Sequence, residues 1–125
     1  MTLLLDAGSL IALDRDDRAM WVRLKMAREA SQPPVTHAGV LGQAWRGGPR
    51  QARLSRALDG VEVRPLDEPL GRGAGELLGG THGADVIDAA LVLLANDGDQ
   101  IATSDPDDLA ELAAVSGRHV ELIQV

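Results

Sequence analysis

The 125-residue chain contains no cysteine, and its only aromatic residues are two tryptophans. Without cysteine, disulfide bonds and thiolate metal sites are excluded, which fits a reducing compartment such as the cytoplasm. Without Phe and Tyr, the core must be built from Leu, Val, Ile and Ala. No apolar stretch approaches the roughly 18 residues that span a bilayer, and the N-terminus lacks the basic region of a signal peptide. We therefore expect a cytoplasmic protein that does not contact membranes.

Lysine is almost absent as well. The single one is Lys25, so nearly all positive charge comes from arginine, and the net charge is −7. A negative net charge argues against nucleic acid as a ligand, but the segment 46–56 contains four arginines and no acid. Arginine binds phosphate in a bidentate manner. Arg46, Arg50 and Arg53 are therefore candidate RNA phosphate contacts if the Gly47-Gly48 break is modest. The alternative is an ordinary solvated helix face.

Strand-like and helix-like segments alternate along the whole chain. The balanced hydropathy and the length indicate one domain, residues 1–125. The expected strands are 3–6, 35–36, 61–64, 100–103 and 120–125. The expected helices are 9–13, 18–30, 37–45, 50–58, 68–78, 86–95 and 106–116. This alternation predicts an α/β fold with a central parallel sheet covered by helices on both faces.

Aspartates occupy the edges of the most apolar segments. Asp6 closes Leu3-Leu4-Leu5, Asp85 and Asp88 open the segment 86–95, and Asp105 follows Ile101-Ala102-Thr103-Ser104. Helix capping offers an alternative role for Asp85, Asp88 and Asp105, but it explains Asp6 less well. In open α/β sheets, ligands bind outside the carboxyl ends of the strands. Convergent carboxylates repel one another unless a cation lies between them, and oxygen ligands suit Mg²⁺ or Mn²⁺. The pattern predicts a metal-dependent hydrolase acting on a phosphodiester.

Three sequence blocks resemble the PIN-domain family. They are Leu3 to Leu13, Asp88 to Val92, and Ile101 to Asp105 followed by Asp108-Leu109; the length and the order of elements also match. Small single PIN-like domains resemble the VapC toxins. The resemblance implies a Mg²⁺- or Mn²⁺-dependent endoribonuclease, the toxin of a type II toxin–antitoxin pair, forming a homodimer and neutralised by a cognate antitoxin. It also assigns Asp6, Asp88 and Asp105 as catalytic metal ligands, with Asp85 or Asp108 as a further carboxylate and Ser9 and Ser104 as small polar neighbours.

One position departs from the family pattern. The family normally has a Glu on the helix after the second strand, and Gln43 occupies the equivalent position here. No acid lies between Glu29 and Asp59 to replace it. A Gln carbonyl can ligate a hard cation but brings no negative charge. The alternative function is therefore a catalytically impaired PIN-fold protein that acts by binding antitoxin or RNA.

Two other acidic α/β classes fit less well. A response-regulator receiver needs a lysine after its last strand, and the only lysine is Lys25. A haloacid-dehalogenase-type phosphatase needs a second Asp two residues after Asp6, where this chain has Gly8.

The remaining unusual side chains have ordinary explanations. Trp21, Met20 and Met26 are expected in the core or a dimer contact, and Trp45 either there or stacked on a base. His37 and His82 are expected in loops near helix starts, without ligand-like spacing.

Overall fold

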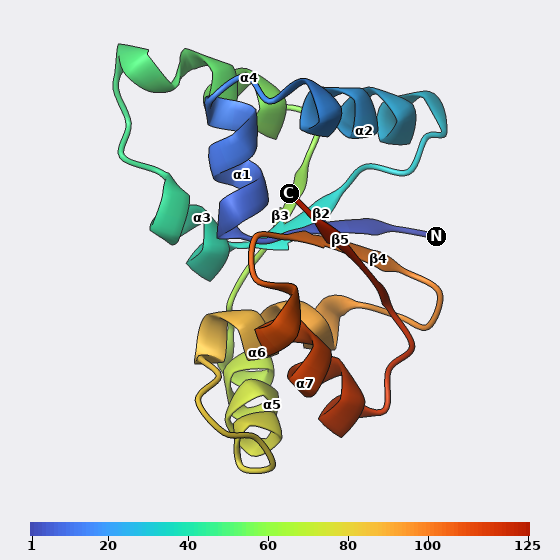
Figure 1. Ribbon diagram of the computed structural model, residues 1–125. Coiled ribbons are helices and arrows are strands. Elements are labelled where there is room, and N and C mark those ends of the chain that lie inside the picture. Colours follow the sequence, from blue (N-terminus) through green and yellow to red (C-terminus); the bar gives the residue numbers. More distant parts are fainter.

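The computed structural model describes residues 1–125 and contains one sheet of five parallel strands. The strand order is β3-β2-β1-β4-β5. The strands are β1 (Leu3–Leu5), β2 (Val35–His37), β3 (Glu62–Arg64), β4 (Gln100–Thr103) and β5 (Glu121–Gln124). In Figure 1 the sheet runs across the middle of the molecule, between two layers of helices. The predicted α/β fold with a central parallel sheet is confirmed.

The helices divide by position in the chain. Three helices of the first half lie above the sheet in Figure 1: α1 (Ala7–Asp14), α2 (Arg18–Glu29) and α4 (Ala52–Leu58), the last preceded by the 3₁₀ turn η1 (Pro49–Gln51). The fourth, α3 (Ala38–Ala44), lies at the left of the sheet and packs into the same core as these three. Those of the second half lie below the sheet: α5 (Glu68–Leu78), α6 (Val86–Leu94) and α7 (Pro106–Ser116). None of these helices is long and apolar enough to cross a membrane.

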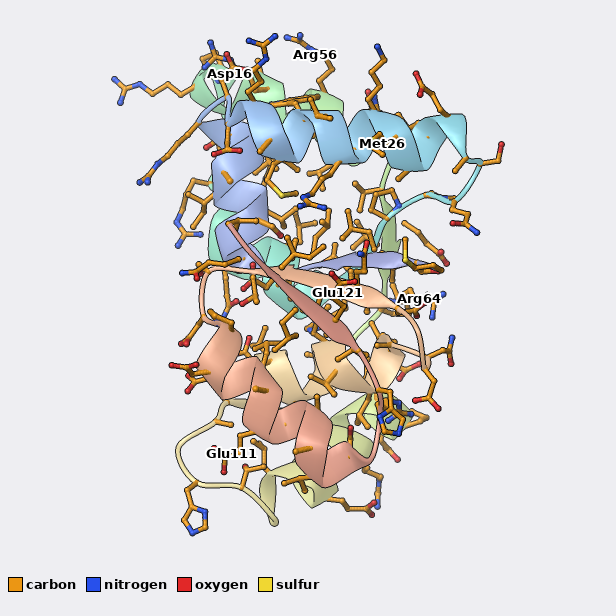
Figure 2. All side chains as sticks on the ribbon, turned by 45° about the vertical axis from the view of Figure 1, so that its right-hand side comes forward. Asp16, Met26, Arg56, Arg64, Glu111 and Glu121 are labelled. Carbon is orange, nitrogen blue, oxygen red and sulfur yellow. The ribbon has the colours of Figure 1, made fainter.

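Each face of the sheet has its own aliphatic core. Successive strand residues point to opposite faces, so Leu4 and Ile101 pack with α5, α6 and α7, whereas Leu3, Leu5 and Ala102 pack with α1 to α4. Aromatic residues contribute little: Trp21 is half-buried against the upper core and Trp45 is exposed. Met20 is buried as expected, but Met26 is exposed on the outside of α2 (Figure 2).

The topology brings the carboxyl ends of β1 and β4 together. β1 pairs with β4 over Leu3 to Leu5 and with β2 at Leu4. The chain adds β2 and β3 on one side of β1 and then crosses to add β4 and β5 on the other. Such a reversal in strand order is where open parallel sheets bind ligands.

Three details differ from the sequence-based expectations. The first helix begins at Ala7 rather than Ser9, with Asp6 as its N-cap, so Ala7-Gly8 are helical and not a turn. His37 ends β2 and caps α3 instead of lying in a loop. The break after Arg46 is not modest, because Gly47 and Gly48 both have positive φ, at 78° and 84°.

Candidate functional site

Asp6 is the most firmly held acid at the carboxyl edge of the sheet. Its side chain is only 5% exposed. One carboxylate oxygen accepts a hydrogen bond from Ser9 N at 2.8 Å, and the other accepts one from Ser104 N at 3.2 Å. The first bond caps α1 and the second joins the ends of β1 and β4. Helix capping therefore accounts for only one of the two carboxylate oxygens of Asp6. The bond to the other oxygen holds the side chain between two neighbouring strands.

The serines predicted beside the site take part in this arrangement. Ser9 is buried, and its hydroxyl donates to the Asp6 carbonyl at 2.9 Å. Ser104 packs so closely against α1 that a Cβ on Gly8 would overlap its side chain. Glycine at position 8 is thus required for the close approach that lets Ser104 N reach Asp6.

Asp85 and Asp88 lie at the start of α6. The Asp85 side chain is the N-cap and accepts from Asp88 N at 2.8 Å, as the capping alternative predicted. The Asp88 carboxylate is not used in that bond. The pKa of Asp88 is raised to about 7, first by burial and then by the carboxylates of Asp85, Asp6, Asp108 and Asp105, in that order. Asp88 therefore lies within electrostatic reach of all the acids singled out from the sequence.

Asp105 and Asp108 complete the group at the start of α7. Asp105 occupies the N-cap position, but its side chain makes no capping bond. Thr103 Oγ1 accepts from Asp105 N at 2.9 Å instead. A hydrogen bond to Asp105 and its charge raise the pKa of Asp108. Both side chains are exposed, so they can reorient toward a ligand.

The donor set fits a hard divalent cation in its chemistry, because every candidate ligand is a carboxylate oxygen. The mutual repulsion that raises the pKa of Asp88 is what a bound cation would relieve. As placed, however, no three His, Asp or Glu side chains converge closely enough to hold one metal ion. Asp6 is fixed, so closing such a site requires Asp88 and Asp105 to turn toward it.

Two further buried residues link the end of β2 to the neighbours of the aspartates: Thr36, which the sequence did not single out, and His37, which was expected in a loop. Thr36 is fully buried, and its hydroxyl donates to the Leu5 carbonyl at 2.8 Å, linking β2 to the residue before Asp6. His37 is also fully buried, and its Nε2 lies 2.9 Å from the carbonyl oxygen of Ile87, the residue before Asp88. Thr36 and His37 are two polar residues at the end of a buried strand. Such residues need hydrogen-bond partners, and this pattern in the sequence could have indicated their role.

Gln43 lies on α3, away from these bonds. Its side chain is exposed. It is one turn beyond Gly39, whose Cα faces the Ile87 side chain, so the two positions share a helix face. Gln43 thus points to the side of α3 that faces the start of α6.

The three predicted RNA-contacting arginines do not share one helix, because Gly47-Gly48 separates Arg46 from Arg50 and Arg53. Arg46 follows α3 and donates to the Gly42 and Trp45 carbonyls, Arg50 is in η1, and Arg53 is in α4. All three are exposed, and none forms an ion pair with an acid of the chain.

The Gln51 side chain holds the loop that carries Arg46. The Gln51 side chain accepts from Arg46 N at 2.6 Å and from Gly47 N at 2.9 Å, and donates to the Ala44 carbonyl. His82, in contrast, is almost fully exposed and contacts Glu111 on α7. It takes no part in the aspartate group.

No protein-family model and no curated protein sequence matches the chain. Among solved structures, a chain from the crystal structure of VapBC2 from Rickettsia felis, bound to a DNA fragment from the promoter, has the same fold. The TM-score is 0.70 over 98% of both chains, at 13% sequence identity. This identity is low enough that the likeness concerns the fold and not the chemistry. The parallel five-stranded sheet, its helices on both faces and this match over nearly the whole chain give the protein a VapC-like PIN fold.

Proposed function

We propose that the chain is a Mg²⁺- or Mn²⁺-dependent endoribonuclease, the toxin of a toxin–antitoxin pair, acting in the cytoplasm. One observation carries the proposal. Asp88, at the start of α6, has its pKa raised to about 7 by burial and by Asp85, Asp6, Asp108 and Asp105. Acids from three separate segments share one field at the carboxyl ends of β1 and β4, where a cation would stabilise them.

The role of each acidic side chain in cation binding would depend on how firmly the fold holds it. Asp6, fixed by two backbone N–H groups, provides the immobile ligand. Asp88 and Asp105 provide the ligands that close on the cation, and Asp85 or Asp108 provides further negative charge. A bound divalent ion would acidify a water molecule and polarise the phosphoryl oxygen of RNA. Near neutral pH without a cation, part of the Asp88 population would hold a proton that metal binding displaces.

Several surface features are assigned to partners within the same proposal. Arg46, Arg50 and Arg53 supply exposed charge for RNA phosphates, which offsets repulsion by the acids. The VapBC2 structure, from a protein of the same fold, supports a cognate antitoxin as a second partner. A homodimer, expected from the family resemblance, is part of the proposal.

A second function is favoured by a specific observation. Gln43 stands where the family has a Glu, and the carboxylates do not converge on one point in the structure. Both features fit a PIN-fold protein with impaired catalysis that acts through antitoxin or RNA binding.

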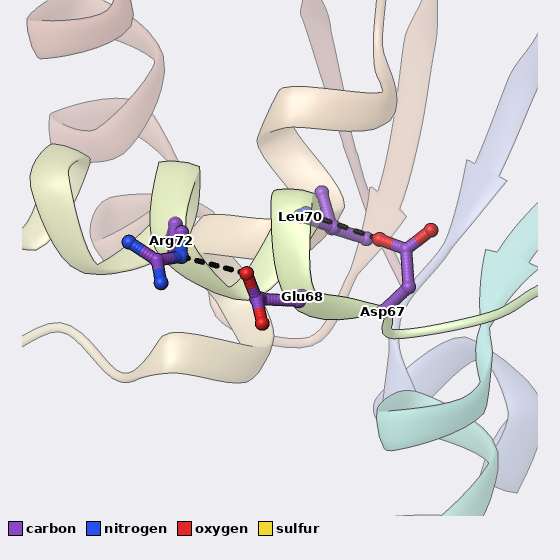
Figure 3. Close-up of polar contacts among 4 residues, drawn as sticks. All are labelled: Asp67, Glu68, Leu70 and Arg72. Carbon is purple, nitrogen blue, oxygen red and sulfur yellow. Dashed lines mark hydrogen bonds and ion pairs between the residues drawn. The ribbon is translucent and has the colours of Figure 1, made fainter.

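Calorimetry with Mn²⁺ on purified protein, freed of any bound partner, distinguishes these functions. The enzyme proposal expects binding by the wild type, at least tenfold weaker binding in Asp6→Asn, Asp88→Asn and Asp105→Asn, and loss of RNA cleavage in each. Asp67→Asn is the control, because Asp67 caps α5 through a similar bond to Leu70 N (Figure 3) and is absent from the groups that raise the pKa of Asp88.

The outcome for Gln43→Glu separates the two functions further. A fourth carboxylate should tighten Mn²⁺ binding and leave cleavage equal or raise it. Absence of Mn²⁺ binding in the wild type rejects the metal-nuclease proposal. Binding without cleavage in the wild type, with cleavage gained in Gln43→Glu, supports the impaired protein.

A further inference from the structure

The imidazole of His37 is a fully buried polar group at the end of β2. Burying a polar ring stabilises a fold only if its nitrogens find partners. Both do: Nδ1 accepts from Gly39 N at 3.1 Å, and Nε2 lies 2.9 Å from the Ile87 carbonyl oxygen. A carbonyl can only accept, so Nε2 carries the hydrogen and Nδ1 is bare. The two bonds therefore select one neutral tautomer.

The two hydrogen bonds of His37 connect it to different parts of the fold. The bond at Nδ1 is local and caps α3, on the upper side of the sheet. The bond at Nε2 crosses to α6, on the lower side (Figure 1). It is the one side-chain hydrogen bond that reaches α6 from another element, since Asp85 belongs to the same turn. His37 thus connects the two helical layers beside the aspartates.

The packing around this bond leaves little free space. A Cβ on Gly39 would lie 2.6 Å from Ile87 Cδ1 and 2.9 Å from His37 Cε1, so both side chains already press against α3. The first turn of α6 is consequently fixed by the Ile87 side chain on one side and by the Ile87 carbonyl on the other. Asp88 is the next residue in that turn and lies within electrostatic reach of Asp6 and Asp105.

We propose that His37 is a positioning residue: by holding the Ile87 carbonyl, it fixes the first turn of α6 and so the backbone position from which Asp88 can turn toward Asp6. The inference rests on the proposed function, in that it gives Asp88 its place in a cation site. The competing role is purely local, as the N-cap of α3 and a filler of the core. Partners that orient a metal ligand typically contribute ten- to a hundredfold to metal affinity.

A pair of substitutions separates the two bonds. His37→Asn keeps an acceptor near the position of Nδ1, and so the cap of α3, but is too short to reach Ile87. His37→Gln keeps a donor near the position of Nε2. We expect the amide hydrogens of residues 88–91 in metal-free protein to exchange at least tenfold faster in His37→Asn and at the wild-type rate in His37→Gln. Mn²⁺ affinity should fall about tenfold in His37→Asn and recover in His37→Gln.

The exchange measurement stands apart from the proposed function, because it needs no metal. Wild-type exchange rates in a folded His37→Asn protein would overturn the positioning role, as would a ¹⁵N spectrum showing hydrogen on Nδ1 rather than Nε2. Failure of the wild type to bind Mn²⁺ would reject the nuclease proposal alone. If His37→Asn does not fold, Gly39→Ala replaces it, since the added methyl pushes Ile87 from His37; unchanged exchange in that variant also overturns the inference.

Discussion

The pKa of Asp88 is strongly raised by the groups around its side chain. Burial and four other carboxylates raise its pKa from 3.8 to about 7. The unfolded chain ionises Asp88 near its ordinary pKa, whereas the folded chain resists ionisation. A group with a raised pKa stabilises the folded state at low pH, and this contribution is lost as the pH rises toward 7. The metal-free site is therefore a source of instability near neutral pH.

Replacing Asp88 with Asn should remove this instability. In a chelating buffer, Asp88→Asn should unfold like the wild type at pH 3, below the ordinary pKa of 3.8, but be more stable by roughly 1–2 kcal/mol at pH 8, after allowance for solvent screening of a partly exposed group. Urea denaturation at the two pH values measures the difference. Adding Mn²⁺ should stabilise only the wild type. An Asn variant whose relative stability does not change with pH would contradict the role assigned to Asp88.

At the scale of elements, the contact between α1 and the end of β4 determines whether Asp6 is held. Gly8, in the first turn of α1, allows Ser104 to pack against the helix and donate to Asp6. The geometry of the fixed ligand thus depends on a missing side chain on one helix and a backbone N–H after a strand.

Gly8→Ala should therefore disrupt the site from the first turn of α1. The added methyl would overlap Ser104, and overpacking of this kind typically costs about 1–3 kcal/mol. We expect a lower Tm by calorimetry and weaker Mn²⁺ binding. Gly75→Ala is the matched control, because Gly75 lies in α5 with open space around its Cβ position; it should stabilise by about 0.5–1 kcal/mol. Equal effects of the two substitutions would contradict the tight contact.

Much of this arrangement of elements follows from the sequence, because the segments are short and clearly bounded. Asp17, Asp67 and Asp85 cap the helices that they precede, and each strand was located within two residues. Asp6 was harder to interpret, since capping and tertiary contact share one side chain. The role of His37 was not predicted, because its partner lies 50 residues away. The separation of Arg46 from Arg50 and Arg53 depends on the positive φ of the two glycines between them, which the sequence alone does not give.

For the whole molecule, charge is distributed unevenly across the sheet. Residues 1–58 carry nine of the twelve Lys and Arg, whereas residues 59–125 carry fourteen of the nineteen Asp and Glu. The first group includes the helices above the sheet and the second those below it. Arg56 and Glu111 mark the two ends in Figure 2. A net charge of −7 therefore conceals a basic layer that can attract a polyanion to one side.

Salt dependence tests whether RNA approaches this basic layer. Arg50→Ala and Arg53→Ala should each weaken RNA binding severalfold and reduce the slope of log affinity against log salt by about 0.7, the value per phosphate contact for single strands. Fluorescence anisotropy with catalytically inactive Asp6→Asn protein measures both. Arg72→Ala is the control, because Arg72 lies on α5 and pairs with Glu68 at 3.0 Å (Figure 3). If all three variants changed the slope of log affinity against log salt equally, the proposal that RNA binds to the basic layer would be contradicted.

The strand order also determines when the aspartate group can form during synthesis. Asp6 lies near the beginning of the chain, yet the backbone N–H that fixes its second oxygen belongs to Ser104, 98 residues later, and β4 is the last strand to join β1. Contacts of such high sequence separation form late in folding. A chain still emerging from the ribosome has Asp6 but neither Asp88 nor Asp105 beside it. The aspartate group therefore cannot assemble until β4 and Asp105 have left the ribosome.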